Sequence, residues 1–182
     1  MDPLLDGIAA IVDRATESWL GIVALTSPIW LGAALWIRSV LLRRRAFREF
    51  AAARRLEFVG IIPSDARLPY KRIQRVAQAV LLSNVVEGQW DGLPIRVFDM
   101  PWRRRGPHLT TILVVVEDTL HRGALAEGVL AARPEARIDT DLDILIVTPQ
   151  RLLDPSELAE WMTFSTTLAK AMERDFKHSL VS

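Results

Sequence analysis

A run of 19 uncharged residues begins at Trp19. As an α-helix this run is roughly 28 Å long at ~1.5 Å per residue, close to the ~30 Å thickness of the hydrocarbon core of a bilayer. If the side chain of Arg38 reaches toward the headgroups, the apolar segment continues to Leu42. Trp19 and Trp36 lie near its two ends, where indole rings favour the membrane interfaces. The sequence therefore predicts a transmembrane helix over residues 19–42.

Two other interpretations of the run fit less well. A cleaved signal peptide needs a basic N-terminal region, yet the first 18 residues contain four acidic side chains and one arginine. A buried helix of a water-soluble protein is rarely this long and uncharged, and it is rarely followed by three consecutive arginines such as Arg43, Arg44 and Arg45. A membrane span explains the run best.

Arginines flank the run unevenly, with one before it and five directly after it: Arg38, Arg43, Arg44, Arg45 and Arg48. Positively charged flanks stay on the cytoplasmic side of a membrane. We therefore expect a protein of the inner (cytoplasmic) membrane with its N-terminus outside and residues 43–182 in the cytoplasm.

Two residues inside the run distinguish it from a plain anchor. Pro28 frees a backbone carbonyl and can kink the helix. Trp30 lies deep in the apolar region, where it either faces lipid or packs against a partner helix or a bound hydrophobic cofactor. The run contains no histidine that could ligate a haem, and we expect no cofactor. The residues expected to contact lipid or partner subunits are Trp19, Pro28, Trp30, Trp36, Arg43, Arg44 and Arg45.

Residues 1–18 have the pattern of an amphipathic helix. Asp2 is a suitable N-cap, Pro3 suits the first helical position, and apolar residues recur on one face. Such a helix lies on the outer membrane surface or docks on a neighbouring protein.

The remaining composition narrows the classes of function. The chain has no cysteine, which excludes disulfides, thiol nucleophiles and cysteine zinc sites. Its net charge of +1 hides a strong segregation: residues 38–75 carry eleven Lys/Arg against three acids, and residues 113–182 carry seven against twelve. The chain therefore has an electrostatic polarity despite its small total charge.

The stretch N-V-V-E-G-Q-W-D-G-L-P-I-R-V-F-D, residues 84–99, predicts a β-hairpin. Asp91-Gly92 between alternating runs favours a two-residue type I′ turn, which sets the pairing register. The expected apolar face pairs Trp90 with Leu93, Gly88 with Ile95 and Val86 with Val97, and the other face pairs Glu87 with Arg96 and Val85 with Phe98. Gly88 then makes room for large neighbours or marks a bulge. Asp99 is a strand-end residue, and none of the acidic residues needs a catalytic role.

Other elements complete an α+β domain. We expect a helix at 46–56, strands at 57–62, 109–118 and 142–148, and a short basic helix at 71–80, while 120–132 fits a helix or a strand. Asp154, Pro155 and Glu157 form a capping box that begins a C-terminal helix with an apolar stripe. The predicted fold is one N-terminal transmembrane helix followed by a small antiparallel meander packed against the C-terminal helix.

Catalytic or metal-binding patterns are weak. Asp139, Asp141 and Asp143 resemble the start of an EF-hand loop, but Ile144 and Gln150 replace the required glycine and glutamate. On one strand the three carboxylates would share a face and could form a weak divalent-cation site, but a charged sheet edge is the better interpretation. The three histidines lack ligand spacing, and no nucleophile or nucleotide-binding motif occurs. We expect neither an enzyme nor a metal site.

The best binding candidate is the loop of Trp102, Arg103, Arg104 and Arg105. An aromatic residue beside three arginines suits a phosphate surface, and a solvated turn is the alternative. Because the domain is tethered to the membrane, anionic lipid headgroups are favoured over nucleic acid.

Several of these segments together resemble a group of uncharacterised bacterial membrane-anchored proteins. The similarity comprises the span, the arginine-rich exit, L-E-F-V-G-I-I-P at 56–63, a hairpin of the form N-V-x-x-G-x-x-x-G-x-x-V-x-x-F-D and a Thr-containing strand at 110–116. It covers residues 43–175, although W-R-R-R-G-P replaces the Gly/Ser-rich segment usual after the hairpin. The resemblance implies an architecture and carries no activity.

These observations lead to a functional hypothesis with three segments: an amphipathic 1–18, a transmembrane helix 19–42 and a cytoplasmic domain 43–182. We expect a non-enzymatic structural or assembly subunit of a larger membrane complex, whose partners are the bilayer and other membrane-protein subunits. The alternative is a membrane-tethered ligand- or lipid-binding regulatory module.

Overall fold

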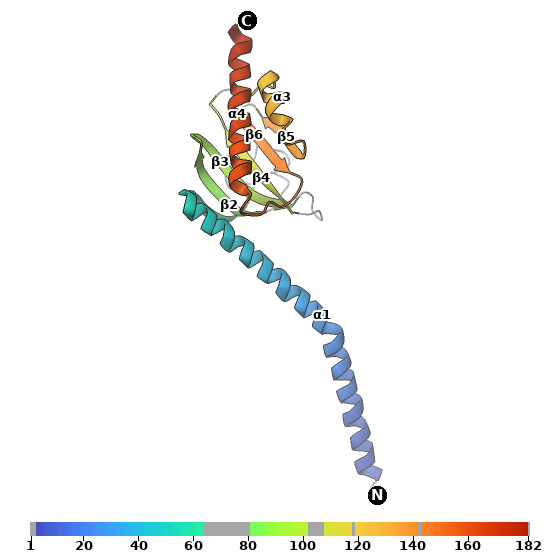
Figure 1. Ribbon diagram of the computed structural model, residues 1–182. Coiled ribbons are helices and arrows are strands. Elements are labelled where there is room, and N and C mark those ends of the chain that lie inside the picture. The colour runs from blue at the N-terminus through green and yellow to red at the C-terminus, as the bar shows by residue number, and fades with distance from the viewer. Residues whose placement is uncertain (1–2, 64–80, 102–107, 118, 142, 182) are drawn as a thin grey trace. The chain divides into compact units, whose positions relative to one another are not determined.

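The computed structural model describes residues 3–63, 81–101, 108–117, 119–141 and 143–181, with side chains from Pro28 onward except those of Pro101 and His108. These residues form three helices and six strands (Figure 1): α1 (Pro3–Arg54), β1 (Glu57–Pro63), β2 (Leu81–Trp90), β3 (Leu93–Pro101), β4 (His108–Val115), α3 (Ala124–Leu130), β5 (Ala136–Asp141), β6 (Ile144–Pro149) and α4 (Leu158–Val181).

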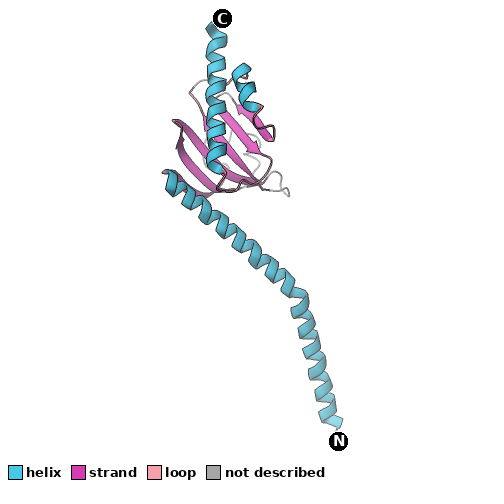
Figure 2. Ribbon diagram, viewed as in Figure 1, coloured by secondary structure: helices cyan, strands magenta, loops and turns pink. Residues whose placement is uncertain are grey.

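The strands form one antiparallel sheet in the order β1-β2-β3-β4-β6-β5 (Figure 2). This confirms the α+β class with a C-terminal helix, and it confirms a meander for the first four strands. The end of the sheet differs from a meander, because β6 pairs with β4 and β5 lies outside it as an edge strand. Strand β5 was not expected, since its sequence A-R-I-D-T-D is half charged.

The hairpin of β2 and β3 follows the predicted register over most of its length. Asp91 and Gly92 both have positive φ, as a type I′ turn requires, and the pairs from Trp90–Leu93 to Val86–Val97 form as expected. The Val85–Phe98 pair is wrong, because a β-bulge shifts the register between Ser83 and Val86. The extra residue is Asn84, whose backbone has φ +53°.

The end of α1 turns into β1 through a Schellman motif. Arg55 takes positive φ, the N–H of Leu56 donates to the carbonyl of Ala51, and the N–H of Arg55 donates to that of Ala52. Leu56 is thereby pressed against the hairpin, where a Cβ on Gly88 would lie 2.6 Å from Leu56 Cδ2. Gly88 therefore makes room for a large neighbour, as expected, and that neighbour comes from the end of α1.

The main core lies on the sheet face that α4 covers (Figure 2). The predicted stripe of α4 supplies the buried residues Leu158, Trp161, Met162, Ser165, Leu168, Ala169 and Met172, while Phe176 is only half-buried. Phe47 and Ala51 from the end of α1 join the same cluster. A second apolar cluster, including Leu82, Phe98 and Leu113, lies on the other face.

The ambiguous segment 120–132 contains the short helix α3, and the strand expected at 142–148 is β6. The three spaced aspartates do not share one strand: Asp139 and Asp141 lie on β5, while Asp143 precedes β6. Because β5 is an edge strand, the interpretation of these residues as a charged sheet edge fits the observed topology. The helix expected at 71–80 lies outside the described residues.

Helix α1 runs without a break from Pro3 through Pro28 to Arg54, so the segments expected at 1–18 and 19–42 and the helix expected at 46–56 share one helix. By compactness the chain divides into an N-terminal unit, Met1–Arg43, and a C-terminal unit, Arg44–Ser182. Among the residues that the structure describes, no helix has the length and apolarity required to cross a membrane. The side chains of Trp19 and its neighbours up to residue 27 are not among them.

Candidate functional site

The one buried carboxylate among the described residues is that of Asp99, which is 2% exposed at the end of β3. Its two oxygens accept hydrogen bonds from different strands. The side-chain amide of Asn84 on β2 donates to Oδ2 at 2.7 Å, and the hydroxyl of Thr110 on β4 donates to Oδ1 at 2.9 Å. A charge is thus stabilised in the core by two oriented dipoles.

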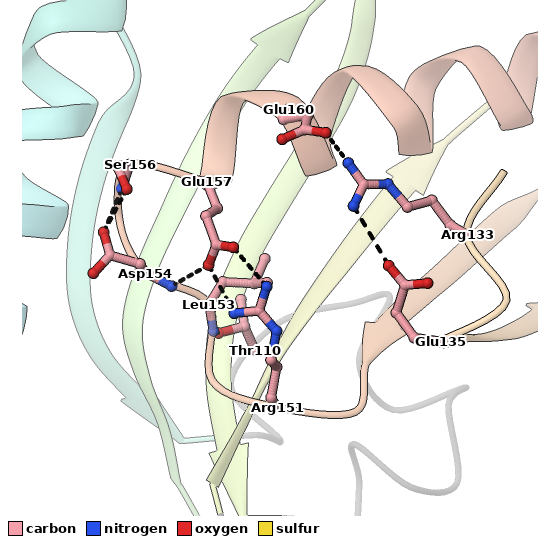
Figure 3. Close-up of polar contacts among 9 residues, drawn as sticks. All are labelled: Thr110, Arg133, Glu135, Arg151, Leu153, Asp154, Ser156, Glu157 and Glu160. Atoms are coloured by element: carbon pink, nitrogen blue, oxygen red, sulfur yellow. Dashed lines mark hydrogen bonds and ion pairs between the residues drawn. The ribbon is translucent and has the colours of Figure 1, made fainter.

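The network continues into the segment that precedes α4. The backbone N–H of Leu153 donates to the hydroxyl oxygen of Thr110 at 3.0 Å (Figure 3). The hydroxyl therefore accepts this bond while it donates to Asp99. Leu153 itself is fully buried. Asp99 and Thr110 are cross-strand partners, and the bulge turns the Asn84 amide toward them. The network therefore joins β2, β3 and β4 to the start of α4.

This buried network was not predicted from the sequence. Asp99 was interpreted as a strand-end residue, and Asn84 and Thr110 as parts of strands. A signal was nonetheless available, since Asn84 and Asp99 are the two polar ends of the hairpin motif and Thr110 lies in the Thr-containing strand that follows it. Their chemistry is that of a structural lock, because each oxygen of the carboxylate accepts a hydrogen bond from another element of the fold.

A second polar cluster surrounds the start of α4 (Figure 3). The hydrogen bonds of the expected capping box form, but on a turn at 155–157, because α4 begins at Leu158 rather than at Pro155. The N–H of Asp154 donates to Glu157 Oε2 and the N–H of Ser156 donates to Asp154 Oδ1, both at 2.9 Å. Arg151 adds two parallel hydrogen bonds to the Glu157 carboxylate, at 2.7 and 2.5 Å. These bonds, with that from the backbone of Asp154, lower the pKa of Glu157 from 4.5 to about 2.

Arg133 connects the same region to the edge of the sheet. Its guanidinium bonds Glu160 on α4 and Glu135 beside β5 (Figure 3), and it lies over the ring of Trp161 with 4.8 Å to the centroid. The arginine thus covers an edge of the core while its charge is paired on both sides.

At the opposite end of the hairpin, the turn is attached to α4. The indole N–H of Trp90 donates to the Thr163 hydroxyl at 3.0 Å, the Thr166 hydroxyl donates to the Asp91 carboxylate at 2.9 Å, and Lys170 donates to the Asp91 carbonyl at 2.6 Å. Trp90 also stacks on Phe50 of α1, with centroids 6.3 Å apart. The Asp91–Gly92 turn therefore has a docking role besides its backbone geometry.

The residues expected to contact membrane or partners are spread along α1. Pro28, Trp30 and Trp36 are exposed, Arg44 and Arg45 are exposed, and Arg43 is half-buried. Trp19 belongs to α1, but its side chain is not described, and the loop of Trp102, Arg103, Arg104 and Arg105 lies outside the described residues. Within the described part of the chain, no cluster of three or more histidine or acidic side chains could hold a metal ion.

Comparison with protein-family models, with curated proteins and with solved structures finds no match for this chain. The site is therefore interpreted from its own geometry.

Replacing Asp99 tests the buried network. Asp99→Ala leaves the Asn84 amide and the Thr110 hydroxyl without their acceptor, and each buried polar group left unpaired costs about 1–3 kcal/mol. We expect the free energy of unfolding, measured by urea denaturation, to fall by about 2–5 kcal/mol. Asp99→Asn, which keeps one acceptor oxygen, should cost less. Asp139→Ala on the edge strand serves as the matched control, and an effect of Asp99→Ala no larger than that of the control would contradict the role of the network.

The low pKa of Glu157 predicts an acid-dependent loss of stability. Because the folded-state pKa, about 2, lies below the ordinary value of 4.5, the contribution is present above pH 4.5 and disappears as the pH falls toward 2. Glu157→Gln should therefore unfold at a lower temperature than the wild type at neutral pH, and the difference should vanish near pH 2. The unfolding temperature of Arg151→Gln should likewise approach that of the wild type near pH 2, since this variant removes the largest cause of the lowered pKa of Glu157. A difference in unfolding temperature that does not change with pH would refute the role of the Arg151–Glu157 pair.

Proposed function

We propose that the chain is a single-pass inner-membrane protein that serves as a non-enzymatic assembly subunit of a larger membrane complex. The observation that supports this most directly is the exposure of large apolar side chains on α1. Nine of them are between 45% and 72% exposed: Ile29, Trp30, Leu31, Leu35, Trp36, Ile37, Val40, Leu41 and Leu42.

These side chains point in every direction around the helix. Successive residues of an α-helix are about 100° apart, so three consecutive apolar residues, as at 29–31 or 35–37, already occupy most of the circumference. A helix that is apolar all round is stable in a membrane or inside a protein. With the uncharged residues from Trp19 onward, this supports a membrane span at 19–42, between an amphipathic segment at 1–18 and a domain at 43–182.

The orientation rests on the arginines that follow the span. Arg43, Arg44 and Arg45 come directly after Leu42, and the first 18 residues carry only one arginine. This asymmetry favours an external N-terminus and a cytoplasmic C-terminal domain.

The proposal of a non-enzymatic role rests on the polar residues of the C-terminal unit, whose hydrogen bonds and ion pairs hold the fold together. Its buried carboxylate is bonded to neighbouring strands, and the clusters at Arg133 and Arg151 hold α4 in place. Trp30 is 72% exposed within the proposed span, where it suits a neighbouring transmembrane helix. The resemblance to membrane-anchored proteins agrees with the proposed architecture. A lipid-binding regulatory module is the alternative, favoured by the arginines at the end of the span.

Charged substitutions test the membrane span. In the wild type we expect the protein to stay in the membrane pellet after alkaline extraction, with a C-terminal reporter active in the cytoplasm. Arg in place of both Leu31 and Leu35 should release it, because each arginine near the centre of a span costs about 2.5–3.5 kcal/mol. Leu125→Arg, on exposed α3, is the matched control. A wild-type reporter active outside would overturn the orientation, and complete extraction of the wild type would overturn the span.

Co-purification tests the assembly role. After extraction in mild detergent, tagged full-length protein should retain companion membrane proteins in fixed ratios, measured by quantitative mass spectrometry. Trp30→Leu should lower their amounts by removing the indole, while Leu31→Ile, on the neighbouring position, should not. A wild-type protein that is monomeric and free of companions would count against the assembly subunit and in favour of the lipid-binding module.

A further inference from the structure

We propose that Arg44 and Arg48 form a clamp for the phosphate of an anionic phospholipid headgroup. The proposal rests on the membrane span proposed above and names the lipid that contacts its cytoplasmic end. It concerns the end of α1, which belongs to the C-terminal unit, and it does not depend on the arginine loop at 102–105.

The two arginines are one helical turn apart on α1, where residues at i and i+4 are neighbours. Arg44 and Arg48 follow Leu42 by two and six residues, which is about 3 and 9 Å along the helix axis. If Leu42 ends the hydrocarbon part of the span, both guanidinium groups lie at the depth of the headgroup phosphates or just beyond them.

Both side chains lean on the same edge strand. The Nη2 atom of Arg44 lies 3.5 Å from the position that a Cβ on Gly60 would occupy. The guanidinium of Arg48 lies over the ring of Phe58, 5.5 Å from its centroid. Strand β1 thus contacts both guanidinium groups, and both residues are exposed.

The positive charges of Arg44 and Arg48 favour the binding of an anion. Among the described residues, the structure records no carboxylate that pairs with Arg44 or Arg48. Two like charges at i and i+4 repel, and a phosphate that bridges them converts the repulsion into charge-assisted hydrogen bonds. Arg45 provides the contrast, because its Nε donates to the Glu49 carboxylate at 2.7 Å, which also raises the pKa of Arg45.

The surroundings add to the positive charge. The end of α1 and the first residue after it also carry Arg54 and Arg55, and within 38–55 there is a single acid, Glu49. A phospholipid is the ligand that this position favours, because the proposed span brings the clamp to the cytoplasmic leaflet, where anionic lipids are concentrated. The guanidinium fork matches phosphate oxygens better than a point charge would.

The test uses the full-length chain in nanodiscs of equal parts phosphatidylglycerol and phosphatidylcholine. After transfer to mild detergent, native mass spectrometry counts the lipids of each class that stay bound. Wild-type protein should retain phosphatidylglycerol in preference. Each arginine near an anionic surface is worth about fivefold in affinity, so Arg44→Gln with Arg48→Gln should reduce the preference up to about twenty-five-fold.

Two matched variants make the outcome specific. Arg45→Gln removes the same charge from an adjacent position that already has a carboxylate partner, and it should leave most of the preference intact. Phe58→Leu removes the ring beneath Arg48 and should cause a partial loss. The clamp would be overturned if the double variant kept the wild-type preference for phosphatidylglycerol. It would also be overturned if Arg45→Gln reduced that preference as much as the double variant does. In both cases the membrane span would stand. Failure of the wild type to enter the nanodisc would overturn both.

Discussion

The closure of the α+β unit depends on a single buried carboxylate. Its oxygens accept hydrogen bonds from the amide of Asn84, which the bulge turns toward Asp99, and from the hydroxyl of Thr110, which lies opposite on β4. The Thr110 hydroxyl then accepts the N–H of Leu153, which places the start of α4 beside the sheet. Because a buried polar group without a partner is costly, loss of one of these contacts weakens the others. Local backbone geometry and helix placement are therefore coupled through one side chain.

How far the sequence predicts this fold depends on how local each signal is. The hairpin register follows from Asp91-Gly92, since a two-residue turn sets the pairing of its neighbours. The capping box at Asp154 predicts the C-terminal helix, which begins at Leu158 after a turn. The bulge at Asn84 could not be predicted from a local pattern, because the side-chain amide of Asn84 donates to Asp99, which is 15 residues away in the sequence. The order of β5 and β6 could not be predicted either. The sequence of β5 is half charged and lacks a strand pattern, and β5 is a strand because it pairs with β6. The candidate site was missed because burial, rather than residue type, gives Asp99 its role.

Helix α1 carries two kinds of apolar surface, one exposed and one buried in the core of the C-terminal unit. The large apolar side chains of α1 between Ile29 and Leu42 are exposed, while Phe47 and Ala51 enter the core of the C-terminal unit. The arginines between these stretches lie where a bilayer would give way to water. A helix with this sequence of surfaces suits a protein that holds a folded unit close to a membrane, and Trp90, stacked on Phe50, holds the helix end to the hairpin.

The attachment of the hairpin turn to α4 has a consequence for the order of events during synthesis. Asp91 and Lys170, which are hydrogen-bonded, are 79 residues apart, and α4 is the last element of the chain. The sheet face that α4 covers therefore stays open until Leu158–Val181 has left the ribosome, well after residues 19–42 have emerged. The proposed span would therefore meet the membrane before the core of the C-terminal unit is complete.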